Sequence, residues 1–189
     1  MRLFQINTIP VLETEGVKLT NQRFEYPPLQ TDRIDLRILN LADAEAVFRH
    51  FSDEEVTRYM DIEPCKDLKE AEEIIQFHID DLGCRWGMFD KERDELIGTC
   101  GYHYLRREHK EFTAEIGFDL SKAYWGQGLM YEGMKEVIDF GFSTMGLTTI
   151  DATVEPENAK SIILMERLGF DRDAELRDQF VYFVLKRND

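Results

Sequence analysis

The sequence predicts a single domain of mixed α/β class, and two patterns carry that prediction. Segments with apolar residues at every second position alternate along the chain with segments whose apolar residues recur every three or four positions. In the middle of the chain, three extended runs follow one another with short polar turns between them, which favours an antiparallel meander. Strands and helices mixed in this way predict a sheet packed against helices. With 189 residues, 43% of them hydrophobic, the chain can bury one substantial core.

Residues 1–30 are expected to form an N-terminal extension, followed by one domain at residues 31–189. Apolar residues in the first segment show no regular spacing. The pair Pro27–Pro28 closes this segment in an extended form, because proline restricts its own backbone and that of the residue before it. The boundary is therefore placed just after the two prolines.

The first part of the domain is predicted to contain a strand followed by two helices. Alternating residues predict the strand at 34–39. The first helix is expected at 40–51, and its first residue is an asparagine, a preferred cap. The second helix is expected at 67–82, where Asp67 and Glu70 have the spacing of a capping box.

The second part of the domain is predicted to begin with the meander and to continue with alternating helices and strands. The polar turns of the meander are rich in Asp, Arg and Lys. The predicted elements are extended runs at 85–89, 95–105 and 112–120, a helix at 129–145, a strand at 149–154, a helix at 159–168 and final strands that end at 180–185.

Charge and hydropathy argue against two kinds of partner. The chain has 23 Lys and Arg against 38 Asp and Glu, so its net charge is 23 minus 38, or −15. Because nucleic-acid binding depends on neutralising phosphates, we expect no nucleic-acid partner. The longest apolar run, at 180–185, is far shorter than the ~20 residues of a membrane-spanning helix, and no export-type apolar segment opens the chain. We therefore expect no membrane partner and a cytoplasmic location.

The cysteines and histidines do not predict a metal site. Cys65, Cys84 and Cys100 are odd in number and too far apart for metal-binding pairs, so we interpret them as reduced thiols. The four histidines likewise lack the spacing of metal ligands. We therefore expect no bound metal.

The stretch Glu115–Met130 predicts a strand, a short glycine loop and the beginning of a helix. Gly126 and Gly128 allow the loop backbone to approach a ligand closely, and the first N–H groups of a helix have no partner within it. Such a turn binds phosphate oxygens. The alternative interpretation is a glycine-rich corner that binds nothing.

Two common phosphate-binding motifs do not fit this loop. A P-loop needs a lysine and a hydroxyl directly after its last glycine, and none follows Gly128. A dinucleotide-binding fold needs a third glycine where this chain has Tyr131. The pattern therefore favours a ligand that carries a diphosphate and requires no metal.

Four blocks of residues in order resemble a known family. They are Leu29–Arg37, Ala114–Phe118, Tyr124–Met130, and Asn158–Ser161 followed by Leu168–Phe170. They are similar to the acyl-CoA-dependent N-acetyltransferases of the GNAT superfamily, in particular the branch that acetylates the amino termini of ribosomal proteins. The resemblance spans the chain from about residue 29 to its carboxyl end. It implies a central, mostly antiparallel twisted sheet of about seven strands with helices on both faces.

The resemblance also implies where acetyl-CoA binds. The loop Trp125–Met130 would hold the pyrophosphate, and the preceding strand would pair with the pantetheine arm through its backbone. Asn158 either bonds this arm or caps the helix that begins at residue 159. The residues implied to contact the cofactor are Phe118, Asp119, Leu120, Lys122, Trp125, Gly126, Gln127, Gly128, Leu129, Met130, Asn158 and Ser161.

Three positions depart from the family's pattern. Trp125 stands where Arg or Gln is usual, and Met130 stands where Ala or Gly is usual. Met165 stands where many members have a tyrosine that protonates the departing thiolate, which methionine cannot do. The resembling branch implies a serine of the same helix as the acid, and Ser161 matches it. The alternative for Ser161 is a hydroxyl bonded to the helix backbone.

Glu115 is the candidate general base. An amine must lose a proton to become a nucleophile, and Glu115 lies on the strand expected beside the thioester. A water chain, or a strand glutamate that merely pairs with a neighbour, are the alternatives. Backbone N–H groups near Phe118 or Asp119 would stabilise an oxyanion if the strand bulges or splays there. His103 is a candidate proton relay or an ordinary core or surface histidine.

The resulting prediction is an N-acetyltransferase that moves an acetyl group from acetyl-CoA to a primary amine by direct attack. A protein N-terminal α-amine is the favoured acceptor. A small amine such as a polyamine or an aminoglycoside, and a non-catalytic acyl-CoA sensor, stay open as alternatives. Tyr59 and Trp86 are candidate aromatics of the acceptor pocket. Residues 1–30 are expected either to make a homodimer contact or to cover the acceptor cleft.

Overall fold

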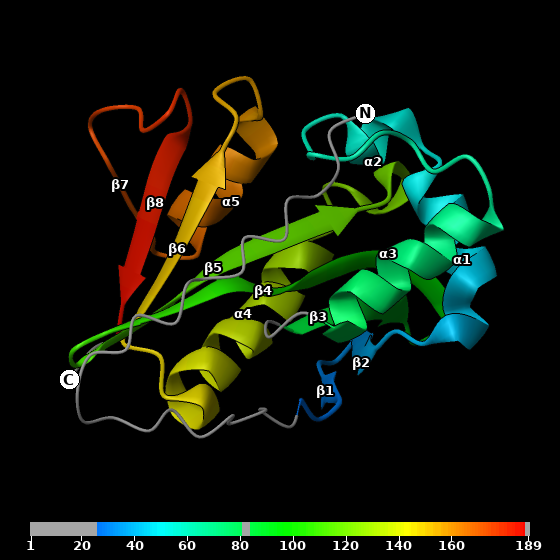
Figure 1. Cartoon of the computed structure of the whole chain (residues 1–189), viewed down its shortest axis with the longest axis horizontal. Helices are drawn as coiled ribbons and strands as arrows, with labels where there is room; N and C mark the ends of the chain where they lie inside the picture. Colours follow the sequence, from blue (N-terminus) through cyan, green and yellow to red (C-terminus); the bar gives the residue numbers. More distant parts are fainter. Residues whose placement is uncertain (1–25, 81–83, 188–189) are drawn as a thin grey trace.

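The structure is a computed structural model that describes residues 26–80 and 84–187, and in this part of the chain one sheet of eight strands forms the centre (Figure 1). The strand order is β1-β2-β3-β4-β5-β6-β8-β7, and only β5 and β6 run parallel. The predicted mostly antiparallel sheet is confirmed. The strands are β1 (Leu29–Gln30), β2 (Ile34–Ile38), β3 (Cys84–Asp90), β4 (Glu95–Glu108), β5 (Glu111–Leu120), β6 (Thr149–Val154), β7 (Asp171–Arg172) and β8 (Val181–Lys186).

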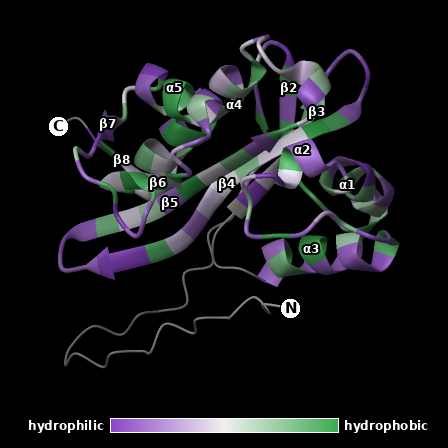
Figure 2. Ribbon diagram, turned by 90° about the horizontal axis from the view of Figure 1, so that it is seen from above, coloured by the Kyte–Doolittle hydropathy of each residue, from purple (hydrophilic) through white to green (hydrophobic). Residues whose placement is uncertain are grey.

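Helices cover both faces of the sheet, as predicted. Figure 2 shows α1 and α3 on one side of β4 and β5, with α4 and α5 on the other side. The helices are α1 (Ala44–Phe51), α2 (Glu54–Thr57), α3 (Leu68–Asp80), α4 (Leu129–Phe140) and α5 (Ala159–Arg167), with 3₁₀ turns η1 (Leu41–Asp43) and η2 (Lys122–Tyr124) and a π-helical segment η3 (Gly141–Met145).

The two predicted helix caps are present. The side chain of Asn40 accepts a hydrogen bond from the N–H of Ala42 at 2.9 Å, and Asp67 accepts one from Glu70 at 2.9 Å. The first turn after Asn40 is 3₁₀ and α1 begins only at Ala44. The last residues of the predicted second helix lie outside the described part of the chain.

Two hydrophobic cores pack against the two faces. The larger lies under α4 and α5 and includes Met134, Ile150 and Phe183, all fully buried. The smaller lies under α1 and α3 and includes Val47 and Ile75, also fully buried. Each such side chain contributes about 1.5–3 kcal/mol when it leaves water. The sheet is thus held between helices, and this fixes the strands that carry the site.

Trp86 belongs to the larger core, so its predicted place in an acceptor pocket was wrong. Its side chain is 0% exposed, and its indole N–H donates to the carbonyl of Pro27 at 2.9 Å. Residues 85–89 of β3 are all buried, because helices cover both faces of this strand. The indole of Trp86 therefore cannot line a pocket that is open to an acceptor.

β5 and β6 diverge after a short paired segment (Figure 1). Their register covers three pairs and ends at Glu115–Asp151. Beyond that pair, β5 continues along β4 to Leu120, and β6 continues along β8 to Val154. Since backbone groups of a strand point alternately to its two neighbours, the groups of residues 116–120 that face β6 have no strand partner there. The splay that the sequence left as a condition for an oxyanion site is thus observed, and it leaves a gap in the strand pairing between β5 and β6.

The described part of the chain begins just before the predicted domain boundary. β1 (Leu29–Gln30) pairs with β2, so these two residues belong to the sheet. Residues 1–25 lie outside the described part, and the predicted extension at 1–30 stays a prediction.

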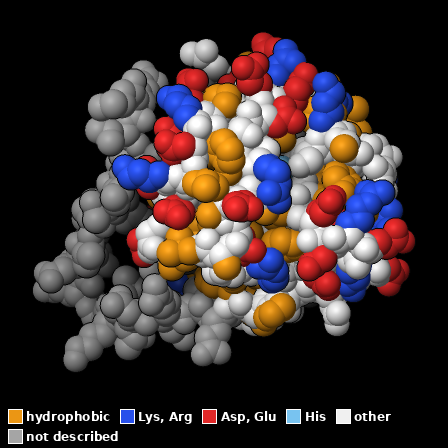
Figure 3. All heavy atoms as spheres, turned by 90° about the vertical axis from the view of Figure 1, so that its right-hand side faces the viewer, with side chains coloured by type: hydrophobic (Ala, Val, Ile, Leu, Met, Phe, Trp, Pro, Cys, Tyr) orange, Lys and Arg blue, Asp and Glu red, His pale blue; other side chains and the backbone are white. Residues whose placement is uncertain are grey.

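The surface over the side where α1 and α3 lie is of mixed charge. Figure 3 shows acidic and basic side chains interspersed over this face. Among the helices of the described residues, none is long and apolar enough to cross a membrane.

Candidate functional site

The loop between β5 and α4 keeps its backbone donors free. Gly126 and Gly128 have φ angles of +74° and +78°, in the left-handed region that glycine adopts without strain. Gly128 caps α4 without a side-chain bond, and the first helical bond runs from the N–H of Glu132 to its carbonyl at 3.0 Å. Within the described residues, the N–H groups of 126–131 donate to no protein acceptor. These donors are therefore available to an anion.

The outer side of the loop is open. A Cβ atom built on Gly126 would meet no heavy atom within 4 Å. A ligand can therefore approach the backbone at Gly126 directly, as the sequence predicted. This observation fits a diphosphate, whose oxygens need converging N–H donors.

Arg33 and Glu132 hold the loop from the opposite side. Arg33 lies between β1 and β2, and its guanidinium donates to the carbonyl of Gln127 at 3.0 Å and to Glu132 at 2.7 Å. The backbone N–H of Arg33 and the hydroxyl of Thr31 also donate to Glu132. Burial would raise the pKa of Glu132, but the bonds from Thr31 and Arg33 outweigh it and lower that pKa. The loop therefore has a defined shape without a ligand.

Trp125 connects the loop to β5 and to α5. Its indole N–H donates to the carbonyl of Leu120 at 2.7 Å. The ammonium of Lys160, on α5, lies 3.4 Å from the centroid of its ring. Trp125 thus spans from the end of β5 to the helix that follows β6.

The side chains of several predicted cofactor residues already have partners or are buried. Asp119 is buried in a polar network, and Lys122 pairs with Glu55 at 3.1 Å. The side chains of Leu129 and Met130 pack in the larger core, at 4% and 6% exposure. Of Leu129 and Met130, the groups available to a ligand are therefore the backbone N–H groups.

The side chains of the other predicted contacts have local roles. Asn158 accepts a hydrogen bond from the N–H of Ser161 at 3.2 Å, so of its two proposed roles the helix cap is observed. The amide of Gln127 donates to the carbonyl of Ala123 at 3.0 Å. Phe118 and Leu120 pack half-buried against the larger core. On the edge of β5 that faces β6, the groups without a partner are therefore backbone groups.

Glu115 lies where β5 and β6 begin to diverge. It is half-buried, and its register partners are His103 on β4 and Asp151 on β6. The hydroxyl of Thr153 donates to its carboxylate at 2.8 Å. The carboxylate therefore sits at the closed end of the gap with one oriented hydrogen bond.

Ser161 lies in the first turn of α5, the helix that follows β6. It is half-buried, and its hydroxyl bonds no other group in the part of the chain that the structure describes. The local backbone bond considered as its alternative is therefore not formed. Met165 is 0% exposed in the larger core. Glu115 and Ser161 thus belong to the two sides of the gap, one to β5 and one to the helix after β6.

Two side chains near Glu115 already have hydrogen-bond partners. Arg85 donates to Nε2 of His103 at 2.7 Å, so this nitrogen acts as an acceptor. The hydroxyl of Tyr182 donates to Asp151 at 2.8 Å, and burial together with Asp151 raises the pKa of Tyr182. Sequence reasoning missed the Tyr182–Asp151 pair, which joins separate strands.

A buried polar network anchors the end of β5 to α1. Asp119 accepts hydrogen bonds from His50 at 2.5 Å, from Thr99 and from Arg85. Burial would raise the pKa of Asp119, but the charge of Arg85 and the bonds from His50 and Thr99 hold it well below its usual range. The network was missed because His50, Arg85 and Asp119 lie on separate elements without a motif.

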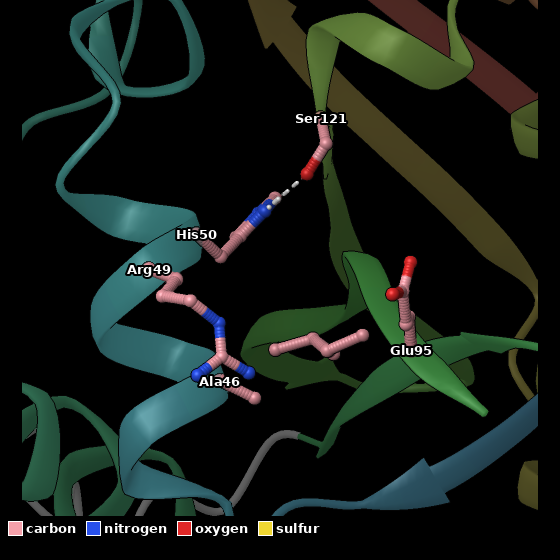
Figure 4. Close-up of a pocket in the computed structure, with 6 residues that line it drawn as sticks. Ala46, Arg49, His50, Glu95 and Ser121 are labelled. Carbon is pink, nitrogen blue, oxygen red and sulfur yellow. Dashed lines mark hydrogen bonds between the residues drawn. The ribbon is translucent and has the colours of Figure 1, made fainter. Parts of the chain in front are cut away.

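The network borders a cavity of about 210 Å³ on the side of α1. The second ring nitrogen of His50 lies 2.8 Å from the hydroxyl of Ser121, and both face the cavity (Figure 4). Its walls come from α1, β4 and the residue after β5, so it is separate from the gap between β5 and β6. The lining residues are Ala46, Arg49, His50, Glu95, Leu96 and Ser121.

Metal-binding clusters are also absent from residues 26–80 and 84–187. In this part of the chain, no group of three or more His, Cys, Asp or Glu side chains is placed to hold an ion. Cys65 and Cys100 are buried free thiols, and burial raises the pKa of Cys100 to about 12.

Comparison with known proteins identifies similar sequences. A family model described as the acetyltransferase (GNAT) domain matches residues 33–171. An uncharacterized N-acetyltransferase of Bacillus licheniformis is 42% identical over 155 residues, 79% of this chain and 85% of that protein. The ribosomal protein uS5-alanine N-acetyltransferase of Escherichia coli is 28% identical over 158 residues, 79% of this chain and 81% of that protein. The spermidine N(1)-acetyltransferase of Escherichia coli is 28% identical over 149 residues, 78% of this chain and 77% of that protein.

Solved structures share the fold. A GNAT-family acetyltransferase from Bacillus anthracis superposes with a TM-score of 0.72 at 22% identity, covering 85% of this chain and 98% of that one. The spermidine N-acetyltransferase of Vibrio cholerae, in complex with CoA and spermine, gives a TM-score of 0.71 at 22% identity and covers 82% of this chain and 96% of that one. The family model, the relative at 42% identity and the splayed sheet agree. The chain therefore belongs to the GNAT family and is an acetyl-CoA-dependent N-acetyltransferase.

Proposed function

We propose that this chain transfers the acetyl group of acetyl-CoA to the α-amine of a protein amino terminus by direct attack of the amine. One observation carries the proposal: a gap between β5 and β6 begins at Glu115 and leads to a loop with free backbone donors. A base, a strand edge and an anion-binding loop thus follow one another along one segment of chain. This is the order that an acyl-CoA and an attacking amine require.

The cofactor is proposed to lie along β5. The N–H groups of residues 126–130 would hold the diphosphate, and the backbone of residues 118–120 would pair with the pantetheine arm. Acetyl-CoA supplies an acetyl group activated as a thioester. The open side of Gly126 and the free donors around it support this placement.

Glu115 is proposed to take the proton from the attacking amine. An α-amino group has a pKa of about 8 and a lysine-like amine about 10.4, so both are mostly protonated at neutral pH. The hydrogen bond from Thr153 fixes one carboxylate oxygen and leaves the other available. Glu115 therefore combines a basic oxygen with a defined orientation.

Ser161 is proposed to donate a proton to the departing thiolate. Its hydroxyl bonds nothing else among the described residues, and the helix turn that carries it is fixed by Asn158. Met165 is buried, and Tyr182 commits its proton to Asp151. Ser161 is therefore the hydroxyl on α5 that we assign to this role.

A protein α-amine and a polyamine are the two acceptors to separate. The relative that acts on ribosomal protein uS5 alanine supports the first. The spermidine acetyltransferase relative and the net charge of −15, which attracts cations, support the second. The two relatives are equally similar at 28% identity, so the favoured acceptor rests on the resemblance of the four sequence blocks.

An acceptor panel tests the proposal. The protein is incubated with labelled acetyl-CoA and one of four amines: a peptide with a free α-amine, the same peptide formylated at its amino terminus, spermidine, or an aminoglycoside. Thiol release and product mass are measured. Acetylation of the free peptide and not of the formylated one supports the proposal. Acetylation of spermidine alone replaces it with the second acceptor, and thiol release with none of the four contradicts it.

A further inference from the structure

We infer that Lys160 supplies the cation that binds the diphosphate of acyl-CoA, and that the indole of Trp125 positions this cation beside the loop. The inference rests on the cofactor site proposed above, since it names a residue that would complete that site. Lys160 lies on α5, on the opposite side of the gap from β5.

The geometry places Lys160 at the loop. Its ammonium lies 3.4 Å from the ring centroid of Trp125, close enough for a cation–π interaction. The ring itself is fixed, because its N–H donates to the carbonyl of Leu120 at 2.7 Å. Trp125 directly precedes Gly126, where the free donors begin. The indole therefore holds the ammonium close to the expected position of the anion.

Two other cations close to the loop are already paired. The loop Trp125–Met130 contains no Lys or Arg of its own. Arg33 is 2.6 Å from Glu132, and Lys122 is 3.1 Å from Glu55. For residues 26–80 and 84–187, no carboxylate lies within ion-pair distance of Lys160. Its charge is thus available to a phosphate, while the charges of Arg33 and Lys122 are compensated.

The position of Lys160 in α5 supports the same conclusion. It is the second residue of this helix, and the first turn contains no acidic side chain. The helix dipole disfavours a cation at this end, so an isolated lysine there lowers helix stability. A phosphate bound between Lys160 and the loop would reverse that effect. Its negative charge would offset both the ammonium of Lys160 and the partial positive charge at the start of α5.

Calorimetry with three probes tests the inference. CoA, 3′-dephospho-CoA and pantetheine are titrated into the parent protein and into Lys160→Met, Lys160→Arg and Lys69→Met. Lys69 is an exposed lysine on α3 that pairs with Glu73, so its substitution changes the net charge equally at a distant site. Loss of one charge-assisted contact predicts about tenfold weaker CoA binding by Lys160→Met. We expect the same loss with 3′-dephospho-CoA, no change with pantetheine, recovery in Lys160→Arg and parent-like binding in Lys69→Met.

Fluorescence gives an independent measurement. Trp86, the second tryptophan, is fully buried, so a change in emission on CoA binding reports mainly on Trp125. We expect this change in the parent, a smaller one in Lys160→Met, and none in Trp125→Phe, which keeps an aromatic ring under the ammonium. Parent and Lys160→Met proteins that respond equally would contradict the positioning by Trp125.

The outcomes separate this inference from the proposed function. If the parent binds CoA and Lys160→Met binds it within twofold of the parent, Lys160 is not the cation and the cofactor site stands. If the loss is seen with CoA but disappears with 3′-dephospho-CoA, Lys160 contacts the 3′-phosphate and the diphosphate assignment is wrong. If the parent protein does not bind CoA, the proposed site itself fails.

Discussion

Arg33 and Glu132 are 99 residues apart in the sequence, yet the guanidinium of one lies 2.6 Å from the carboxylate of the other. The same guanidinium donates to the carbonyl of Gln127 inside the loop. A residue before β2 and a residue of α4 thus fix the backbone whose N–H groups face outward.

Breaking this pair is predicted to weaken cofactor binding without stopping the reaction. Arg33 is half exposed, so the loss is modest, and we expect Arg33→Leu and Glu132→Gln to raise the KM for acetyl-CoA about threefold. The kcat is expected to stay within twofold of the parent value, because neither Arg33 nor Glu132 contacts the proposed base, Glu115. Arg172→Leu, which breaks the pair Arg172–Glu166, is the control, since Arg172 is exposed to the same extent as Arg33. A lower kcat at constant KM would contradict the positioning role.

Asp119→Asn is predicted to destabilise the protein by about 3 kcal/mol, because it leaves the charge of Arg85 buried without its partner. Denaturant unfolding measures this free energy. Asp171→Asn, at an exposed position on β7, is the control and is expected to change it by less than about 0.5 kcal/mol. Equal stability of the two variants would show that the network does not stabilise the fold.

The same network predicts an acid dependence of stability. The folded pKa of Asp119 is lowered, whereas an unfolded aspartate titrates near ~3.9. The unfolded state therefore binds the proton first, and the stabilisation is complete above about pH 5 and is lost as pH falls from about 4 toward the folded pKa. The free energy of unfolding is expected to decrease over this range, with a smaller slope in Asp119→Asn. An identical slope in both proteins would assign the acid dependence to other carboxylates.

Glu115→Gln is predicted to reduce kcat at least 100-fold, the lower range for removal of a general base. Glutamine still accepts the hydrogen bond from Thr153, so CoA affinity is expected to be unchanged. Glu111→Gln, at an exposed position of the same strand, is the control. Steady-state rates over a pH series check this: the variant is expected to recover rate at high pH, where the free amine is more abundant. A loss smaller than threefold at neutral pH would favour a water chain as the base.

Ser161→Ala is predicted to reduce kcat about tenfold, because the departing thiolate loses its proton donor. The helix is expected to keep its stability, since the bond to Asn158 comes from the backbone N–H of residue 161. Ser143→Ala, which removes another helix hydroxyl, is the control. An unchanged kcat together with an unchanged KM for acetyl-CoA would remove Ser161 from both of its assigned roles.

Local sequence patterns predicted the strands and helices that bury one face in a core and expose the other to solvent. β6 has the predicted bounds, Thr149–Val154, and α5 begins at the predicted Ala159, because alternation and an asparagine cap are both readable in the sequence. The predicted helix at 129–145 is continuous but changes to a π-helix after Phe140. The short elements β1 and α2 were missed because two to four residues have no measurable period.

Contacts between distant segments could not be predicted in the same way. The loop glycines were found because a left-handed turn needs a particular residue type at a particular place. The partners of Arg33 and Asp119 lie on other elements, and an ion pair across the fold leaves no periodic signal. The splay after Glu115 was expected only as a condition for an oxyanion site, and its position became known from the strand register.

The most direct test of the cofactor site is the affinity of Gly126→Ala for CoA. Gly126 and Gly146 both have left-handed backbones, with φ of +74° and +75°, and both are open to solvent, so alanine imposes a similar strain at each. Only Gly126 lies among the free donors. Calorimetric titration with CoA is expected to show parent-like binding for Gly146→Ala and at least tenfold weaker binding for Gly126→Ala. Equal binding by both variants, or no heat with the parent protein, would contradict the account.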